Sequence, residues 1–162
     1  MAWDINLPEW RTLPDIGLYM DQVITLMERT FEGLHLREGI TKSMVNNYVK
    51  AGLIPRPVNK RYDREQLAML QEIAVLKQAL SMEEIAVILD MQKRSGVREG
   101  YGWFCAQVQA VADTIAEGGT PRMPENACER AAYLGVAAAV CTICARRALS
   151  QTQEKKNPAA EA

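Results

Sequence analysis

The stretch from Thr41 to Arg64 constrains the fold more than any other, because it combines a short helix, a stop and a basic loop. Its sequence is TKSMVNNYVKAGLIPRPVNKRYDR. Thr41 is a good N-cap, since its hydroxyl can accept a hydrogen bond from a free amide of the first turn. Gly52 tolerates a left-handed backbone and ends the helix, and Pro55 and Pro57 prevent it from restarting. The stretch therefore predicts a helix, a compact loop and the start of a second helix.

The two sides of this short helix differ in character. Its apolar residues fall at helical spacing and predict a buried stripe of Met44, Val45, Tyr48 and Val49. The other side is rich in amides and lies beside a basic loop, a combination that suits a DNA groove flanked by phosphates. We therefore predict that eight residues bind DNA: Lys42, Ser43, Asn46, Asn47, Lys50, Arg56, Lys60 and Arg61.

Charge is unevenly distributed along the chain. The formal net charge is −1, yet residues 37–64 hold seven basic and two acidic side chains, which leaves −6 on the remainder. Such asymmetry favours a local anionic partner over a generally adhesive basic surface. The alternative is an ordinary charged surface without a partner.

Helical periodicity and capping signals predict the rest of the secondary structure. Capping boxes open two helices, at Asp63 with Gln66 and at Ser81 with Glu84. Glycines and prolines mark the loop GGTPRMPEN as a break between the last two helices. Together the signals predict helices over residues 18–31, about 41–51, 63–80, 81 to about 93, 101–116 and 125–150.

The chain is expected to divide into four parts. These are an N-terminal arm (1–17), a DNA-binding head (18–95), a C-terminal helical region (96–150) and a disordered polar tail (151–162). Trp3 and Trp10 of the arm, which is predicted to lack regular structure, are expected to dock onto the domain. His35, the single histidine, is expected in an exposed loop.

The motifs of the head resemble those of the MerR family of winged helix-turn-helix regulators. Those heads have a recognition helix that ends in Tyr-x-x-x-Gly-Leu, a wing that ends in Arg/Lys-x-Tyr, and a later helix that opens on Ser-x-x-Glu-Ile. The matching residues here are Tyr48, Gly52, Leu53, Lys60, Tyr62, Ser81, Glu84 and Ile85. Over about residues 7–95, the opening LPDIGLYMDQV with TKSMVNNYVK resembles an uncharacterised bacterial family, domain of unknown function 1836, which is regarded as MerR-like. The resemblance implies a winged helix-turn-helix fold and DNA binding.

The chain departs from the MerR pattern in its recognition helix. Asn46 and Asn47 stand where MerR heads usually have an arginine and a tyrosine, so the phosphate clamp that these provide is missing or replaced. Asparagine can pair with an adenine edge, each good pair being worth roughly 1–3 kcal/mol of discrimination. Alternatively, the two asparagines are solvated polar residues, or one of them caps a turn.

The cysteines are the other candidate for chemistry. Cys141 and Cys144 have metal-ligand spacing, with Cys128 upstream on the same predicted helix. They lie among alanines and valine, where cysteine packs well, and the single histidine is far away in the sequence. We therefore predict core packing, with a thiol sensor as the alternative, and neither a metal nor a cofactor. One histidine and the lack of a Walker or Rossmann glycine loop also argue against an enzyme.

These observations predict an all-α protein: a MerR-like winged helix-turn-helix head with a small wing, followed by a C-terminal helical hairpin. The predicted function is that of a sequence-specific, DNA-binding transcriptional regulator, with double-stranded DNA and a second copy of the chain as partners. One alternative is a protein–protein interaction module that no longer binds DNA. Another is a regulator that responds to a thiol reagent or to a small-molecule effector.

We expect a cytoplasmic location. The N-terminus has neither the basic nor the apolar region of a secretory signal. The longest weakly polar run, residues 131–145, is shorter than the roughly 20 residues of a membrane helix.

Overall fold

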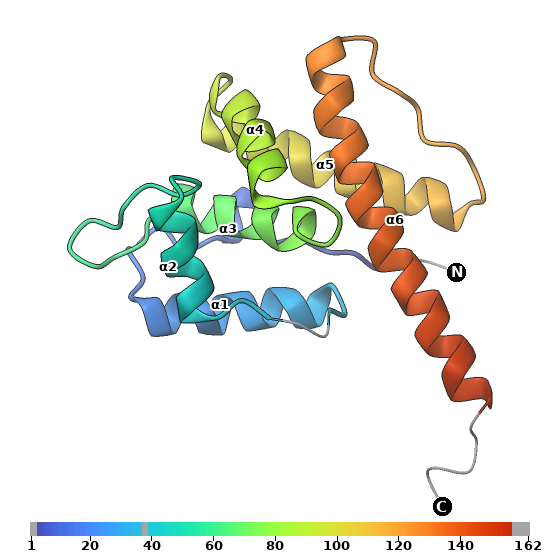
Figure 1. Ribbon diagram of the computed structural model, residues 1–162, viewed down its shortest axis with the longest axis horizontal. Helices are drawn as coiled ribbons and strands as arrows, with labels where there is room; N and C mark the ends of the chain where they lie inside the picture. Colours follow the sequence, from blue (N-terminus) through green and yellow to red (C-terminus); the bar gives the residue numbers. More distant parts are fainter. Residues whose placement is uncertain (1–2, 37–38, 157–162) are drawn as a thin grey trace, which may run out of the picture.

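The computed structural model describes residues 3–36 and 39–156 (Figure 1). This part of the chain forms helices connected by loops, and it contains isolated β-bridges but no β-strand. The prediction of an all-α protein is therefore confirmed. The elements are the 3₁₀ helix η1 (Trp10–Thr12) and the α-helices α1 (Met20–Gly33), α2 (Lys42–Lys50), α3 (Arg64–Leu76), α4 (Met82–Lys93), α5 (Val97–Ala116) and α6 (Ala127–Lys156).

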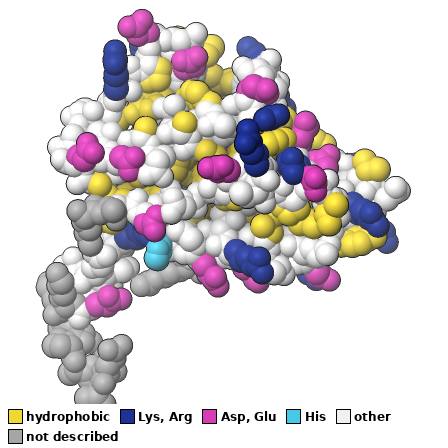
Figure 2. Space-filling model, turned by 180° about the vertical axis from the view of Figure 1, so that it is seen from behind, with side chains coloured by type: hydrophobic (Ala, Val, Ile, Leu, Met, Phe, Trp, Pro, Cys, Tyr) yellow, Lys and Arg dark blue, Asp and Glu magenta, His cyan; other side chains and the backbone are white. Residues whose placement is uncertain are grey.

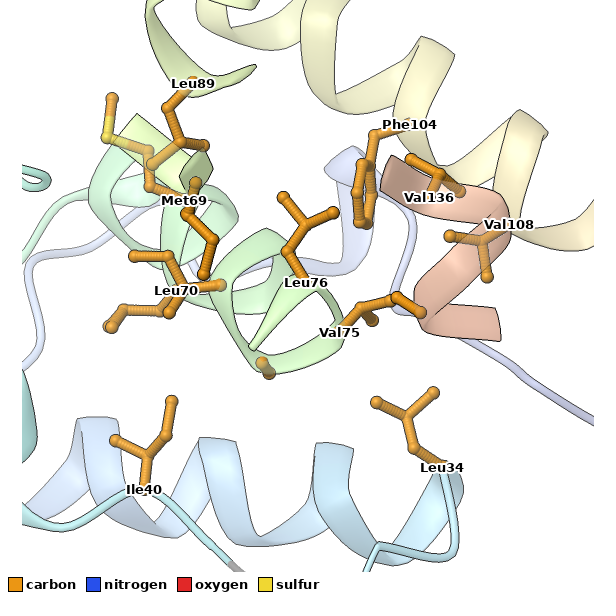
Figure 3. Close-up of a cluster of buried hydrophobic side chains, with 14 of the residues drawn as sticks. Leu34, Ile40, Met69, Leu70, Val75, Leu76, Leu89, Phe104, Val108 and Val136 are labelled. Atoms are coloured by element: carbon orange, nitrogen blue, oxygen red, sulfur yellow. The ribbon is translucent and has the colours of Figure 1, made fainter. Parts of the chain in front are cut away.

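Helix α3 is the centre of the fold. Every residue from Gln66 to Leu76 is buried, because the helix is apolar on nearly all sides and must be enclosed by other elements. Helix α1 packs on one side of it, whereas α5 and α6 pack on the other. Figure 3 shows this arrangement, with Val75 and Leu76 between Leu34 below and Phe104 above.

Local hydrogen bonds define where the helices begin. The Asp63 carboxylate accepts from the Gln66 amide nitrogen at 2.9 Å, and the Gln66 side chain accepts from the Asp63 nitrogen at 2.7 Å. The same reciprocal pair joins Ser81 and Glu84, at 3.2 and 2.7 Å. Both predicted capping boxes are thus confirmed, and each satisfies two backbone donors that the first helical turn would leave free.

Three helix boundaries differ from the predictions by more than two residues. Helix α3 ends at Leu76 instead of residue 80, because i→i+3 backbone bonds tighten the chain ahead of the cap at Ser81. Helix α5 begins at Val97, directly after Gly96, whose φ of 94° is accessible to glycine. Helix α6 continues to Lys156, so the predicted disorder of the tail is wrong for residues 151–156, where good helix formers extend the helix. Residues 157–162 of that tail lie outside the described residues.

The N-terminal arm docks onto the domain as predicted. Trp3 packs against the main hydrophobic core, and the ring centroid of Trp10 lies 6.4 Å from that of Tyr101 on α5. The Tyr101 hydroxyl donates to the carbonyl of Pro8 at 2.6 Å. The arm is not devoid of regular structure, because residues 10–12 form η1.

The predicted C-terminal hairpin is a pair of crossing helices. Helix α6 packs against α5 and crosses it, and its last turns project beyond the rest of the domain (Figure 1). Gly135 allows α6 to approach α4 closely, since an added Cβ would lie 2.7 Å from Ile88 Cδ1. Among the described helices, α6 alone has the length and apolar composition of a membrane span, over Ala127–Glu154, and less than half of its most apolar 18-residue window is buried. A core helix has the same properties, and α6 contributes a full face to the core.

Candidate nucleic-acid interface

Helix α2 presents the predicted polar face to solvent. The Thr41 hydroxyl caps it by accepting from the Met44 nitrogen at 3.2 Å. Val45 and Tyr48 are buried against the domain, and burial raises the pKa of the Tyr48 hydroxyl. All five predicted groove-facing side chains are exposed: Lys42, Ser43, Asn46, Asn47 and Lys50.

At the place of the predicted small wing, the loop after α2 forms a tight turn that an isolated β-bridge between Val58 and Arg61 closes. The Arg61 nitrogen donates to the carbonyl of Val58 at 2.9 Å, and the two central residues, Asn59 and Lys60, have φ values of 50° and 61°. Positive φ at both central positions is the signature of a type I′ turn. The turn projects Lys60 and Val58 into solvent, and Val58 is 74% exposed. Figure 2 shows basic and apolar side chains together at this end of the molecule, at the right of the view.

Backbone bridges fasten the base of this loop to the segment before α1. Leu18 and Tyr62 exchange two backbone hydrogen bonds, of 2.9 and 2.8 Å. At the start of the loop, the carbonyl of Pro55 accepts a hydrogen bond from the Gln66 side chain at 2.9 Å. Tyr62 is buried, and desolvation raises its pKa. The basic loop is therefore held at both ends by the domain core.

Tyr19, which the sequence analysis did not single out, orients one of the predicted basic residues. The Arg61 guanidinium donates to the Tyr19 hydroxyl at 3.0 Å and lies 5.0 Å from the centroid of the Tyr19 ring. Gly17 makes this approach possible, since an added Cβ would lie 2.8 Å from Arg61 Cβ. Stacking on an aromatic ring favours a cation and restricts its rotamers. Arg61 is exposed yet fixed in direction.

Lys42 differs from the other basic residues of this surface. Its ammonium forms an ion pair with the carboxylate of Asp21 in the first turn of α1, and both side chains are largely exposed. By contrast, Lys50, Arg56 and Lys60 have no ion-pair partner within the described ranges 3–36 and 39–156. The surface thus contains three unpaired cations, one oriented arginine and one lysine that is already neutralised by a neighbour.

The family model for the domain of unknown function DUF1836 matches residues 8–103. The chain belongs to the DUF1836 family. This confirms the resemblance to domain of unknown function 1836, and the match extends beyond the predicted end at residue 95 into the first turns of α5. No curated protein and no solved structure matches the chain.

The DUF1836 region contains the whole candidate interface and ends before α6. It includes the arm from Pro8, all of α1 to α4 and the loop with Arg56, Lys60 and Arg61. Tyr19 and Asp21, which contact Arg61 and Lys42, also lie within it. No local signal in the sequence identifies Tyr19 and Asp21, because each contacts a residue that lies far away along the chain.

Two other sequence candidates lie outside this interface. His35 is exposed at the end of α1 with a φ of 53°, as predicted for a loop histidine. Cys144 is buried as predicted, whereas Cys141 is exposed, so the prediction of core packing is wrong for Cys141. Since α6 has 3.6 residues per turn, the two side chains are about 60° apart around the helix, and Cys141 falls just beyond the face that the core covers. No group of three metal-ligating side chains occurs among the described residues.

Proposed function

We propose that the protein is a sequence-specific, DNA-binding transcriptional regulator whose head is a MerR-like winged helix-turn-helix. One observation carries the proposal: the exposed polar face of α2 adjoins a basic turn that the core holds at both ends. A short helix can enter the major groove with its side chains toward base edges, while a neighbouring loop contacts phosphates. For helix and loop to contact different parts of the DNA at once, their relative position must be fixed. The β-bridge between Leu18 and Tyr62 helps to hold the loop in place.

The residues of the surface fall into two roles. Asn46 and Asn47 lie in the middle of the exposed face, with no apolar contact to bury them, and an asparagine side chain matches the N6 and N7 atoms of adenine. Lys50, Arg56, Lys60 and Arg61 would contact phosphates, which supply affinity without reading sequence. Ser43 can donate to a base edge or to a phosphate. Lys42 contributes least, because DNA would have to compete with Asp21 for it.

A homodimer with α6 at its interface fits this function. The exposed face of α6 carries apolar residues at alternating intervals of three and four: Ala131, Leu134, Ala138, Cys141, Ala145 and Ala148. A seven-residue repeat of this kind is the pattern of a two-helix seam, and small side chains allow two helices to approach closely. Two-fold symmetry would present two α2 helices to half-sites one or more DNA turns apart, at roughly 34 Å per turn. A regulator of this kind acts in the cytoplasm, where we expect the chain.

Capture of genomic DNA fragments by the purified protein tests the proposal. We expect the wild type to enrich a palindromic motif. The Asn46→Ala/Asn47→Ala variant should lose sequence preference, because each lost base contact removes roughly 1–3 kcal/mol of discrimination. Arg98→Ala/Arg122→Ala is a matched control, since it removes two exposed cations that lie away from α2 and its loop.

The outcomes separate the proposal from its alternative. Enrichment of no sequence at low salt would refute DNA recognition and leave the interaction module as the better description. Unchanged preference in the asparagine variant would refute the assignment of Asn46 and Asn47 to base recognition, while DNA binding itself would stand. Equal losses in the control variant would indicate a general charge effect without a specific interface.

A further inference from the structure

A second feature of the molecule, remote from α2, is a cavity where α4, α5 and α6 meet. Its volume is about 430 Å³, which lies within the range of small-molecule sites. The apolar part of its wall comes from Met91 at the end of α4, Trp103 on α5 and Ala132 on α6. The exposed Cys128 also lines it. The three helices therefore border an open cavity that has a tryptophan in its wall and a cysteine beside it.

The charge of this cavity is predominantly negative. Glu99 and Glu129 line it together with a single basic residue, Arg94, and all three side chains are exposed at the rim. An indole face attracts cations through its quadrupole, and tryptophan does so best among the aromatic side chains. Carboxylates at the rim and an indole in the wall both favour a ligand with positive charge.

A buried carboxyl lies directly behind the cavity wall. Gln92 lines the cavity and, with its amide nitrogen turned inward, donates to the carboxyl oxygens of Glu72, 3.2 Å away for Oε1. Glu72 is 2% exposed, and burial raises its pKa to about 8 although Lys93 nearby lowers it. Gln92 therefore joins the lining of the cavity to a buried carboxyl.

We propose that this cavity binds an organic monocation with an apolar body, such as a quaternary or protonated amine. Trp103 and Met91 would contact the apolar body and the cationic head, while Glu129 and Glu99 balance the charge at the rim. The inference does not depend on DNA binding, because no residue of the cavity belongs to α2 or to the loop that follows it.

Alkylation of the cysteines gives a direct test with the full-length protein. Neutral iodoacetamide reacts with the thiols, and mass spectrometry follows the rate at Cys128 and, as a reference outside the protein, at glutathione added to the same solution. Millimolar benzyltrimethylammonium should slow the reaction at Cys128 and leave that of glutathione unchanged. Benzyl alcohol, which is neutral, and benzenesulfonate, which is anionic, should give little protection at the same concentration.

Variants identify the groups that bind the probe. Trp103→Leu should weaken protection by benzyltrimethylammonium roughly 3- to 30-fold, the range expected for loss of a cation–π contact. Glu129→Gln should weaken it as well, whereas Glu125→Gln, a control at an exposed position outside the cavity, should not. Equal protection by benzyl alcohol, slowing at both Cys128 and glutathione, or no protection at all would each overturn the proposal.

Discussion

The two exposed helical faces of this protein, on α2 and on α6, are opposite in chemistry. Helix α2 hides its apolar side and offers amides and cations, next to a loop that hydrogen bonds hold in place. Helix α6 buries a larger apolar side and still leaves a second apolar stripe in water. An exposed polar face beside unpaired cations suits a polyanion, whereas an exposed apolar stripe suits another apolar surface. Exposure by itself therefore does not indicate a partner. The chemistry of the exposed side chains indicates which kind of partner each face can bind.

The largest expected effect comes from disrupting the α6 face. Ala138→Arg places a long charged side chain near the middle of the exposed stripe without touching the core. We expect the dimer to dissociate completely, so that light scattering after size exclusion gives half the wild-type mass. Ala110→Arg, at an exposed position of α5 outside the stripe, is the matched control.

The same variant, Ala138→Arg, tests whether DNA binding by the α2 face is independent of dimer formation by the α6 face. Monomeric Ala138→Arg protein should bind a single half-site about as well as one wild-type head does, because α2 and its loop are unchanged. Its affinity for the full palindrome should fall by roughly 100-fold or more, as expected when a linked second contact is lost. A wild type that is already monomeric would contradict the assignment of α6 to a dimer interface.

A smaller effect is expected from the loop after α2. Lys60→Ala/Arg61→Ala should weaken binding to all DNA sequences alike and reduce the slope of log affinity against log salt by about 2, since each phosphate contact contributes close to 0.9. Titrations of labelled duplexes over a range of salt concentrations measure both quantities. Dimer dissociation, which depends on an apolar seam, should change little over the same range. An unchanged slope would exclude these two residues from phosphate contact.

The core between the two faces contains a carboxyl, Glu72, that should make the stability of the protein depend on pH. Glu72 has a pKa raised from 4.5 to about 8, chiefly by burial, and the charged or titratable groups near it are Lys93 on α4 and Tyr101 and Cys105 on α5. The folded protein thus holds the Glu72 proton more tightly than the unfolded chain does. This contribution to the free energy of unfolding is complete below pH about 4.5 and is lost as the pH rises through about 8.

Replacement of this carboxyl by an amide tests the pH effect. Glu72→Gln removes the titration and nearly preserves the shape of the side chain. We expect its Tm at pH 9 to exceed that of the wild type by roughly 3–6 °C, with a smaller difference at pH 6, in thermal melts followed by circular dichroism. Glu65→Gln, at an exposed position of the same helix, should show no such difference. A wild-type Tm that does not fall toward pH 9 would show that Glu72 is ionised in the folded protein.

Sequence patterns predicted the features that depend on neighbours along the chain. The capping boxes at Asp63 and Ser81 connect residues three positions apart, so their hydrogen bonds are encoded locally. The exposed and buried sides of α2 follow from helical spacing in the same way. For α6, spacing indicated an apolar helix but not which of its sides the core would cover. That choice depends on α4 and α5, which are distant in sequence, and it left Cys141 exposed.

The contacts that tune the candidate interface could not be predicted, because they join segments far apart in sequence. Tyr19 and Arg61 are separated by 42 positions, and Lys42 meets Asp21 across the space between α1 and α2. Neither pair has a local signature. The positive φ of Lys60 has no local signature either, since lysine has no preference for a left-handed backbone. The geometry of the turn imposes this φ value.

The smallest predicted effect concerns Tyr19, and it tests whether rigidity matters on the α2 side. Tyr19→Phe keeps the ring beneath the Arg61 guanidinium but removes the hydroxyl that accepts its hydrogen bond. The loss of one exposed hydrogen bond should lower DNA affinity about threefold, within the range of 0.5–1.5 kcal/mol for such bonds. Titration of a labelled operator duplex measures the change.

Combining Tyr19→Phe with Arg61→Ala distinguishes orientation from direct contact. If Tyr19 acts only by holding Arg61, its substitution should have no further effect once the arginine is absent, so the two free-energy changes will not add. Additive changes would instead mean that the Tyr19 hydroxyl contacts DNA itself. In either case the variant leaves the α6 seam intact, because the start of α1 and the loop after α2 lie at the opposite end of the molecule from the projecting turns of α6 (Figure 1). An effect on dimer dissociation would therefore contradict the separation of the two faces.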